Sequence, residues 1–500
     1  MMQLIRSALC LVLASSCFAV PTTQRTKQDH GQCNQTQVVI LGAGTAGIAA
    51  AQTLSNLSIN DFIIVEYNNG IGGRLTNKDF GEKKSGDGQY TVELGANWVQ
   101  GLRSVDSGED NPIWRLARKW NISNEESDYS SIKTYNENGE ADFSSLFDEF
   151  QEATNALEDD ATALADKYQD RSVRAGLRRG GWNPAKTDSP AGAVAVEYFS
   201  WDFESASNPE TSSQVFGASS QAFEINYDNI TYHEYSGEDR FVVDQRGFRA
   251  WLVGEADTFL TKQDHRLALN TIVTNISYSD AGVIIRNKDG SCIQADYAIC
   301  TFSLGVLQRE VVAFDPELPD WKLDGINSFE FNTFTKIFYQ FDEAFWPNET
   351  QFFLYADPTT RGYWPVWQSL TPKGFLPGSN IIFSVMTAEQ SQRIEAQDDD
   401  VTMQEGLDVL RNMFPDADIP QPIAFFYPRW RDTPWSYGSY SNWPPATTLE
   451  MHQDLRANVS DRLFFAGEAT SAPYFGYLHG AWFEGIDAGQ TVAKLILANV

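Results

Sequence analysis

A glycine-rich segment near the start of the chain has the spacing of a phosphate-binding turn. Gly42, Gly44 and Gly47 form a G-x-G-x-x-G pattern directly after the apolar run 38–41 and before a helical pattern. The first glycine permits a tight turn, the second lets the backbone approach a pyrophosphate, and the third allows helix and strand to pack closely. The residues that we expect against the bound group are Gly42, Gly44, Ala46 and Gly47.

An acidic residue follows at the distance that such a turn requires. A second apolar run, 62–65, ends at Glu66, which is 19 residues after Gly47. A carboxylate at that place accepts hydrogen bonds from ribose hydroxyls. A chance cluster of glycines is the alternative, but strand, turn, helix and second strand all stand in the required order. The sequence therefore predicts a site for an adenine dinucleotide.

Other periodic segments indicate what must surround this site. The first and last strand-like segments are both followed by glycine, so both termini are expected to close one nucleotide-binding domain around an inserted second domain. The further elements expected are a helix at 142–170, strands within 265–302, 331–385 and 422–443, a strand at 462–466 and a final helix at 480–498.

Composition and charge narrow the classes of partner. The chain is 42% hydrophobic, 13% aromatic and 21% charged, which excludes a disordered or collagen-like protein. Its 37 Lys and Arg stand against 67 Asp and Glu, a formal net charge of −30. Such a surface repels nucleic-acid phosphates and anionic lipids and attracts cations. We therefore expect no nucleic-acid partner and favour a small cationic molecule.

The N-terminal residues have the pattern of a secretory signal peptide. Arg6 precedes an apolar run, 8–19, that is too short to span a bilayer, and Cys17 and Ala19 provide the small residues of a cleavage site. We therefore predict that residues 1–19 are removed, that the protein is extracellular, and that it has no membrane span. Seven N-x-[S/T] sequons predict N-glycans, at Asn34, Asn56, Asn121, Asn229, Asn275, Asn348 and Asn458.

Cysteine and histidine are too sparse for a disulfide framework or a metal centre. Cys33, Cys292 and Cys300 remain after the signal peptide and allow one bridge, for which Cys292–Cys300 across a local strand pair is one option. The five histidines show no ligand spacing, so no metal is expected. No G-x-S-x-G pattern supports a hydrolase.

Four further sequence motifs follow the glycine turn along the chain. They are GIGGR at 70–74, ELGANW at 93–98, FAGEAT at 465–470 and GYLHGA at 476–481. With the glycine turn they resemble the FAD-dependent amine oxidase family, and within it the secreted polyamine oxidases of plant and fungal type, over essentially all of 36–498.

The resemblance implies an α/β fold with two interleaved domains. One is a Rossmann-like FAD-binding domain, and the other is an α+β substrate domain with a mixed sheet and flanking helices. The expected boundaries are 36–105, 236–330 and 446–500 for the FAD-binding domain and 106–235 and 331–445 for the substrate domain. No motif reports the oligomeric state, and we favour a monomer.

The resemblance also implies FAD, held noncovalently because 465–489 contains no cysteine for a covalent flavin bond. Glu468 would hold the ribityl–phosphate part. Backbone N–H groups of the helix after Gly476 would face the pyrimidine edge of the flavin. The other cofactor contacts that it implies are Gly73, Arg74, Gly95, Ala96, Asn97, Trp98, Val273, Trp430, Gly467, Tyr477 and Leu478.

One lysine is the candidate catalytic residue. Oxidation of a C–N bond needs a neutral amine held close to the flavin. Lys336, in the segment TKIF, resembles the family lysine that reaches the flavin N5 through a water. A strand lysine that extends to solvent is the alternative reading.

The remaining site residues implied are aromatic and acidic. Rings can flank an aliphatic polyamine and attract its ammonium groups, and Trp98, Tyr440 and Tyr477 stand where the family places them. Glu204 matches an acidic position of the plant pattern. The sequence departs from that pattern at two places: Gln100 stands where plant members have glutamate and animal members histidine, and Phe334 stands where plant members have tyrosine.

The resulting hypothesis is oxidation of spermine or spermidine at a secondary amine by hydride transfer to FAD. Hydrolysis of the imine then gives an aldehyde and a shorter amine, and O2 is reduced to H2O2. An L-amino-acid or monoamine oxidase on the same scaffold stays open, because Arg429 or Arg431 could serve a carboxylate. So does a flavoprotein that binds polyamines without oxidising them.

Overall fold

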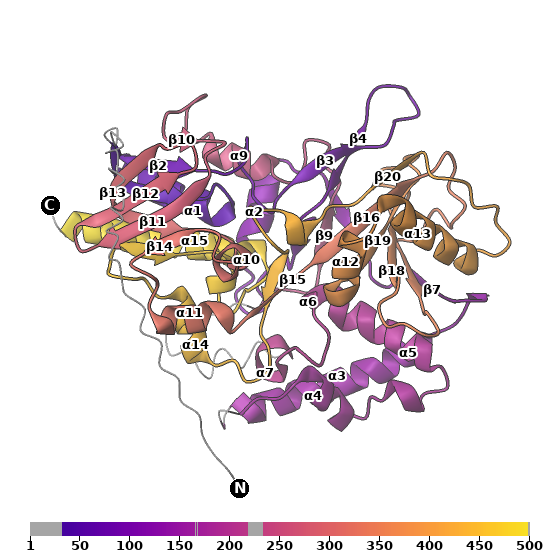
Figure 1. Ribbon diagram of the computed structural model, residues 1–500. Helices are drawn as coiled ribbons and strands as arrows, with labels where there is room; N and C mark the ends of the chain where they lie inside the picture. The colour runs from indigo at the N-terminus through magenta and orange to yellow at the C-terminus, as the bar shows by residue number, and fades with distance from the viewer. Residues whose placement is uncertain (1–32, 166, 168, 219–233, 499–500) are drawn as a thin grey trace, which may run out of the picture.

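The computed structural model describes residues 33–165, 167, 169–218 and 234–498. The predicted signal peptide, 1–19, and the sequon at Asn229 lie outside these residues. Two large sheets lie at opposite ends of the molecule, one beside the C-terminal helix and one beside α13 (Figure 1).

The first large sheet is built around two central parallel strands. β1 runs parallel to β2 on one side and to β13 on the other. Its apolar residues are fully buried because both faces of the sheet are covered. The strands, in sheet order, are β10 (Leu267–Ala268), β2 (Phe62–Val65), β1 (Asn34–Leu41), β13 (Cys292–Cys300), β12 (Gly282–Asn287), β11 (Val273–Ser279) and β14 (Ala313–Asp315), with β22 (Leu463–Phe465) also paired to β13.

Two helices from opposite ends of the chain cover this sheet together. α1 (Thr45–Asn56) begins directly after the glycine turn, and α15 (Leu478–Ala498) packs against it. The contact requires a residue without a side chain, because a Cβ added at Gly485 would lie 2.2 Å from the carbonyl oxygen of Ala46. The strand–glycine–helix–strand unit expected from the sequence is therefore present, and both termini contribute to it.

The second large sheet is mixed, and all but one of its strand pairs are antiparallel. Its strands come from 132–140 and 334–426, so the chain enters this region twice. In sheet order they are β20 (Ala424–Phe426), β16 (Phe334–Gln340), β19 (Ile381–Thr387), β18 (Val366–Ser369), β17 (Phe352–Tyr355), β7 (Ile132–Asn136) and β8 (Gly139–Glu140).

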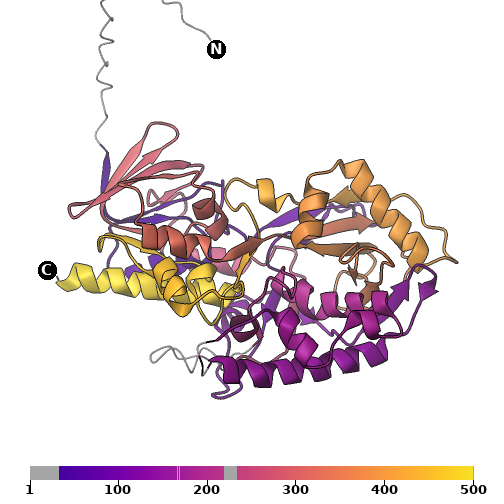
Figure 2. The same cartoon turned by 60° about the horizontal axis from the view of Figure 1, so that its bottom comes forward.

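Helices cover both faces of this sheet, as Figure 2 also shows. Successive strand residues point to opposite faces, so Phe352 packs with one helix group and Phe353 with the other. One group is α3 (Ser144–Ala165), α4 (Val173–Arg179) and α5 (Pro190–Glu197), and the other is α12 (Ala388–Glu395) and α13 (Asp399–Met413). A sheet covered on both faces gives β16 an interior in which a lysine can be fully buried.

Short elements connect the two sheets. The small sheets pair β3 (Asn77–Phe80) with β4 (Tyr90–Glu93), β5 (Trp98–Gln100) and β6 (Asn124–Glu126) with β9 (Asp239–Val242), and β15 (Glu330–Asn332) with β21 (Tyr440–Asn442). The other α-helices of the described residues are α2 (Pro112–Lys119), α6 (Phe203–Ser205), α7 (Gln214–Ala218), α9 (Ala250–Ala256), α10 (Leu304–Gln308), α11 (Asp320–Asn327) and α14 (Leu449–Arg456).

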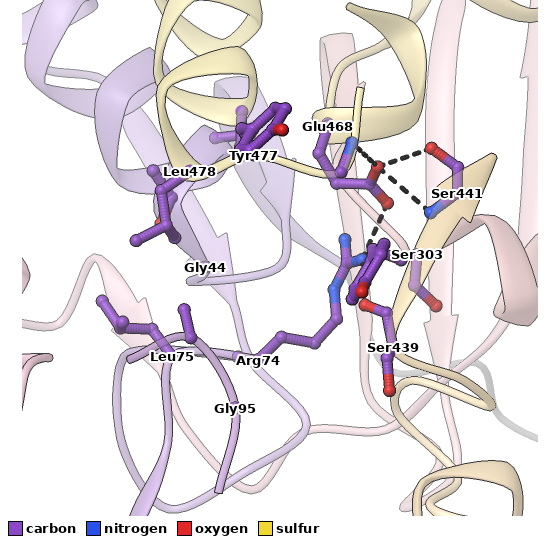
Figure 3. A pocket seen from close by; sticks show the side chains of 18 of the residues that line it. Gly44, Arg74, Leu75, Gly95, Ser303, Ser439, Ser441, Glu468, Tyr477 and Leu478 are labelled. Carbon is purple, nitrogen blue, oxygen red and sulfur yellow. Dashed lines mark hydrogen bonds and ion pairs between the residues drawn. The ribbon is translucent and has the colours of Figure 1, made fainter. Parts of the chain in front are cut away.

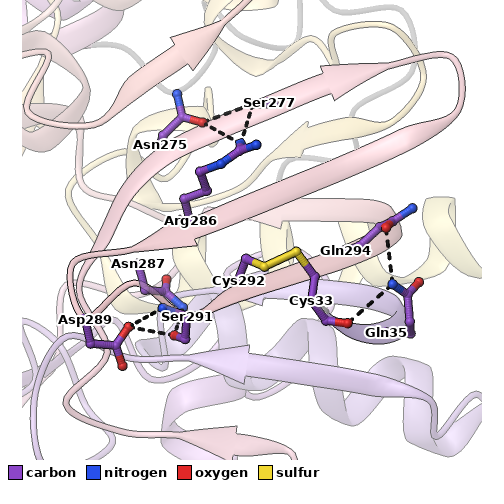
Figure 4. The surroundings of a disulfide bond; sticks show 10 residues. All are labelled: Cys33, Gln35, Asn275, Ser277, Arg286, Asn287, Asp289, Ser291, Cys292 and Gln294. Atoms are coloured by element: carbon purple, nitrogen blue, oxygen red, sulfur yellow. Dashed lines mark hydrogen bonds between the residues drawn. A yellow bond between two sulfur atoms is a disulfide. The ribbon is translucent and has the colours of Figure 1, made fainter. Parts of the chain in front are cut away.

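The disulfide option drawn from the sequence is wrong. Cys33 pairs with Cys292, although they are 259 positions apart in the sequence (Figure 4). Cys300 is free and buried. Cys292 and Cys300 are the two ends of β13, and eight residues of one strand span on the order of 26 Å. Cys33 instead reaches Cys292 because β1 and β13 are parallel neighbours, with Asn34 opposite Ile293.

The predicted fold class is confirmed: a nucleotide-binding α/β part interleaves with a mixed sheet and its helices. The domain boundaries themselves stay a prediction. Within the ranges given above, no helix combines the length and apolar character needed to cross a bilayer. In the same residues, no three His, Cys, Asp or Glu side chains are grouped to hold a metal ion.

Candidate active site

A cavity of about 1030 Å³ lies between the two large sheets. It extends from the glycine turn before α1 to the start of α15 and onward to the side chains of β5, β16 and α6. The predicted cofactor residues that line it are Gly42, Gly44, Ala46, Glu66, Gly73, Arg74, Gly95, Ala96, Asn97, Trp98, Val273, Trp430, Gly467, Glu468, Gly476, Tyr477 and Leu478. The predicted substrate residues Gln100, Glu204, Phe334 and Tyr440 line it too.

The glycine turn presents backbone to one end of the cavity. α1 begins after Gly44 with no side chain capping its first N–H groups, so these donors remain for a ligand. Gly47 is the one glycine of the motif outside the lining. A Cβ there would lie 1.9 Å from the carbonyl oxygen of Gly42, so this glycine serves the close packing of helix on turn.

Glu66 closes the same end of the cavity. One carboxylate oxygen accepts the N–H of Ala43 at 2.8 Å, and the other accepts the backbone and side-chain N–H groups of Asn68 at 2.8 and 3.0 Å. Burial raises the pKa of Glu66, and these hydrogen bonds oppose the shift. Each oxygen has two lone pairs, so the oxygen bonded to Ala43 can still accept a hydroxyl.

An arginine–glutamate pair forms part of the cavity wall (Figure 3). Arg74 donates to Glu468 at 2.7 Å and to the carbonyl of Ser439 at 2.8 Å. The second carboxylate oxygen of Glu468 accepts the hydroxyl of Ser441 at 2.6 Å and the N–H of Gly476 at 2.8 Å. Glu468 therefore joins segments from four parts of the chain and holds the turn that leads into α15.

Lys336 lies directly behind the cavity wall. It is 1% exposed, and its Nζ donates to the carbonyl oxygens of Glu93 and Gly95 at 3.1 and 2.9 Å and to Oδ1 of Asn97 at 3.0 Å. Three acceptors match the three N–H groups of an ammonium. Burial lowers the pKa of Lys336, and attraction to Glu93 opposes this. A lysine that extends to solvent is thus excluded; the side chain supports the Gly95–Trp98 segment that lines the cavity.

Glu93 is a buried acid that the sequence analysis did not single out. One of its oxygens accepts the N–H of Phe248 at 2.6 Å, and the other has no hydrogen-bond partner. Burial raises the pKa of Glu93, and the positive charge of Lys336 opposes the shift. The protonation state of each side chain therefore affects the pKa of the other. The place of Glu93 in the ELGANW segment could have indicated a role, because this carboxylate stands directly before predicted cofactor residues. A carboxylate buried there needs a charged or hydrogen-bonding partner.

Glu204 is the centre of a polar cluster at the other end of the cavity. Its Oε1 accepts the phenol of Tyr477 at 2.6 Å and the amide of Gln100 at 3.0 Å, while its backbone carbonyl accepts the phenol of Tyr440 at 2.9 Å. Glu204 is exposed to the cavity, and its enclosure by the surrounding wall raises its pKa to about 7; the bond from Tyr477 opposes this and the charge of Asp239 adds to it. The structure thus brings four of the predicted substrate residues into mutual contact.

Aromatic rings complete the wall around this acid. The Phe334 ring lies 6.1 Å from that of Tyr440 and 5.7 Å from that of Phe203. Trp98 meets Phe203 edge to face at 6.1 Å. These rings leave a passage with apolar sides and a carboxylate, which suits an aliphatic chain that carries positive charge.

Comparison with known proteins identifies the family. The family model for flavin-containing amine oxidoreductases matches residues 45–493. Polyamine oxidase 7 of Oryza sativa subsp. japonica is 37% identical over 469 residues, which are 90% of this chain and 94% of that protein. Polyamine oxidase 1 of Zea mays is 35% identical over 481 residues, which are 92% of this chain and 91% of that protein.

The chain belongs to the flavin-containing amine oxidoreductases. Among solved structures, a redesigned putrescine oxidase double mutant matches with a TM-score of 0.70 at 14% identity, over 93% of this chain and all of that one. That likeness shows the shared fold. The protein is an FAD-dependent amine oxidase.

The cavity of this amine oxidase suits FAD by its own features. The uncapped start of α1 offers N–H donors to a pyrophosphate, and Glu66 retains a lone pair for a ribose hydroxyl. In the wall, the indole N–H of Trp430 is buried without a partner, which is the kind of donor that a bound ring system satisfies. The helix α15 begins at this space, because its first residue, Leu478, lines the cavity, and a helix N-terminus favours negative charge.

Proposed function

We propose that this amine oxidase is a secreted polyamine oxidase that oxidises spermine or spermidine at a secondary amine, with O2 as acceptor, to an aminoaldehyde, a shorter amine and H2O2. The observation that carries the proposal is Glu204. Its carboxylate lines an aromatic cavity, and among the described residues no lysine or arginine lies within ion-pair distance of it. A cationic substrate supplies the missing counter-charge.

The charge of the cavity disfavours a carboxylate substrate. Arg429, one candidate anchor for an amino acid, pairs with Asp399 at 2.6 Å and donates to the carbonyl of Glu395 at 3.0 Å. Arg431, the other candidate, donates to Gln392. Within the described chain, the one arginine that lines the cavity is Arg74, which is already paired with Glu468.

Each residue then has a task that follows from its contacts. Glu204 binds an ammonium group, and the rings of Tyr440, Tyr477 and Phe334 hold the aliphatic chain and exclude water. Lys336 holds or accepts a proton at Nζ, beside the segment that faces the cofactor. Bound FAD supplies the acceptor for the hydride that leaves the α-carbon and passes both electrons to O2.

The charges and atoms balance in this scheme. The substrate enters as a neutral amine, and loss of hydride from its α-carbon gives an iminium cation. Loss of the N–H proton gives the imine, to which water adds to give the aldehyde and the shorter amine. The hydride carries two electrons and one proton, and the proton released from nitrogen is the second one that O2 needs. O2 takes two electrons and two protons to become H2O2. The noncovalent attachment of FAD is part of the proposal, since no cysteine of the described chain lines the cavity.

Secretion is supported by two independent features. The bridge between Cys33 and Cys292 is of a kind that persists in oxidising compartments. Four sequon asparagines are exposed, namely Asn34, Asn56, Asn121 and Asn348, and we propose that they carry glycans. Asn275 and Asn458 are half-buried and donate their side-chain N–H groups, to Ala313 and Asp461, which disfavours their modification.

Anaerobic mixing of the purified holoenzyme with spermidine tests the proposal. The flavin absorbance should bleach at a rate that accounts for turnover, and analysis of products should find either putrescine or 1,3-diaminopropane beside the aldehyde. Leucine and phenylethylamine serve as comparison substrates. If only these bleach the flavin, the protein is an amino-acid or monoamine oxidase. If spermidine binds without bleaching, it is a non-catalytic polyamine-binding flavoprotein.

A further inference from the structure

Asp239 lies next to the cation site but was not among the residues drawn from the sequence. It begins β9 and stands directly opposite Gln100 in the antiparallel pair of β5 and β9. Residues opposed in this way project to the same face of a sheet. The next opposed pair on that face, Trp98 and Phe241, confirms the direction, because their rings meet at 5.3 Å and Trp98 lines the cavity.

Asp239 does not line the cavity itself, and its hydrogen bonds connect it to the wall. One carboxylate oxygen accepts the N–H of Gly101 at 3.0 Å, which fixes the side chain. The other accepts the phenol of Tyr129 at 3.0 Å, and Tyr129 lines the cavity. Among the described residues no cation pairs with Asp239, so its charge is not neutralised by the protein.

Asp239 and Glu204 influence each other across this wall. The negative charge of Asp239 adds to the rise in the pKa of Glu204, and both carboxylates raise the pKa of Tyr129, after burial, which is the largest cause in each case. Gln100, between them, donates its amide to Glu204 and carries no charge. Two acids therefore surround one neutral amide, and their repulsion would be relieved by a cation.

We propose that Asp239 is a positioning residue that sets the specificity of the amine site: with Glu204 it forms a doubly negative site that selects substrates carrying at least two positive charges. Asp239 acts through its hydrogen bond with the Tyr129 phenol and through the electrostatic field of its carboxylate. Its negative charge on β9 replaces the charge that the neutral Gln100 lacks on β5. The inference rests on the proposed polyamine oxidation and specifies its substrate class as di- and polycations over monoamines.

Asp239→Asn tests the proposal with little risk to folding. The amide can still accept the N–H of Gly101, and the Tyr129 hydroxyl can accept from it in turn. We expect the KM for spermidine to rise about tenfold, which corresponds to about 1.4 kcal/mol. The limiting rate of flavin reduction should change less than twofold, and the KM for a monoamine of equal length should change less than twofold. A structural defect would move both rates and both substrates together.

Two variants make the test specific for charge at this position. Glu238→Gln removes an exposed acid from the adjacent residue and should leave the KM for spermidine within twofold. Gln100→Glu combined with Asp239→Asn moves the carboxylate to the opposed strand and should restore the KM to within threefold of the unmodified enzyme. Equal effects of Glu238→Gln and Asp239→Asn, or no recovery in the double variant, would overturn the proposal.

The unmodified enzyme provides a measurement that needs no variant. A linear diamine should inhibit spermidine oxidation at least ten times more strongly than the monoamine of the same chain length, and equal inhibition would overturn the proposal. Failure of the underlying function is distinguishable, because in that case no polyamine bleaches the flavin of the unmodified enzyme at all.

Discussion

Lys336 and Lys322 are both buried, at 1% and 0% exposure, and each donates to three oxygen acceptors. The acceptors of Lys322 are the carbonyls of Asp454, Leu455 and Ala457 at the end of α14, where a cation stabilises the helix. Lys322 does not line the large cavity, and its ammonium lies over the ring of Phe465 at 3.7 Å. Burial lowers the pKa of both lysines.

What separates the two is the location of their acceptors. Two of the acceptors of Lys336, on Gly95 and Asn97, belong to residues that line the cavity, and Glu93 lies beside Lys336 as a second titratable group. A buried lysine with a lowered pKa is therefore no sign of catalysis by itself. The neighbouring groups decide whether its proton can take part in chemistry or only satisfies carbonyl oxygens.

The comparison predicts opposite outcomes for the two Lys→Met variants. Lys336→Met should slow flavin reduction or reoxidation at least tenfold while FAD stays bound. Lys322→Met should leave both rate constants within twofold and lower the free energy of unfolding by about 2 kcal/mol, because three buried carbonyls lose their donor. Stopped-flow absorbance and chemical denaturation measure the two effects. Unchanged kinetics in Lys336→Met would remove that residue from its role.

A second contrast is between Glu204, which is assigned to substrate binding, and Lys336, which is assigned to the chemical step. Glu204→Gln should raise the KM for spermidine by about 30-fold, because a carboxylate next to an ammonium contributes about 2 kcal/mol once the bound substrate excludes water from the pair. The limiting rate should fall far less, since Lys336 and its partners are unchanged. Steady-state and rapid-reaction kinetics separate the two parameters. A loss confined to the limiting rate would contradict the assignment of Glu204 to binding.

The same carboxylate predicts a pH dependence. Burial raises the pKa of Glu204 to about 7, and the groups facing it are Gln100, Tyr440, Tyr477 and Asp239. A bound cation favours the charged carboxylate, so below about pH 7 binding must release a proton and affinity falls as pH falls. The KM for spermidine should rise up to tenfold per pH unit below about 7 and level off above it. In Glu204→Gln this limb of the profile should be absent.

The smallest effect is expected from Glu93→Gln. Loss of its charge removes an attraction that favours protonated Lys336, so the pKa of Lys336 should fall further and the limb of the rate profile that reports it should move to lower pH. The rate at the plateau should stay within threefold. The pH profile of flavin reduction in both enzymes is the measurement, and a shift to higher pH would show that the two groups do not interact as described.

Local sequence patterns were sufficient to predict some parts of this enzyme. The glycine turn, Glu66 and the strand–helix–strand unit follow from residues that are contiguous, so their geometry depends on spacing alone. Resemblance to a family added Lys336, Glu204 and the tyrosines as site candidates, and the structure groups them around one cavity. It could not say that Lys336 lies behind the wall instead of in it.

The sequence by itself therefore determined the dinucleotide turn, the two-part α/β plan and the acidic character that favours a cationic partner. Only the tertiary structure decided that Cys33 joins Cys292, that Asp239 stands opposite Gln100 and that Lys322 and Lys336 differ. Each of these depends on which distant strands lie side by side and in which register. A shift of one residue in a strand pair would turn every side chain to the other face, and no local pattern reports that choice.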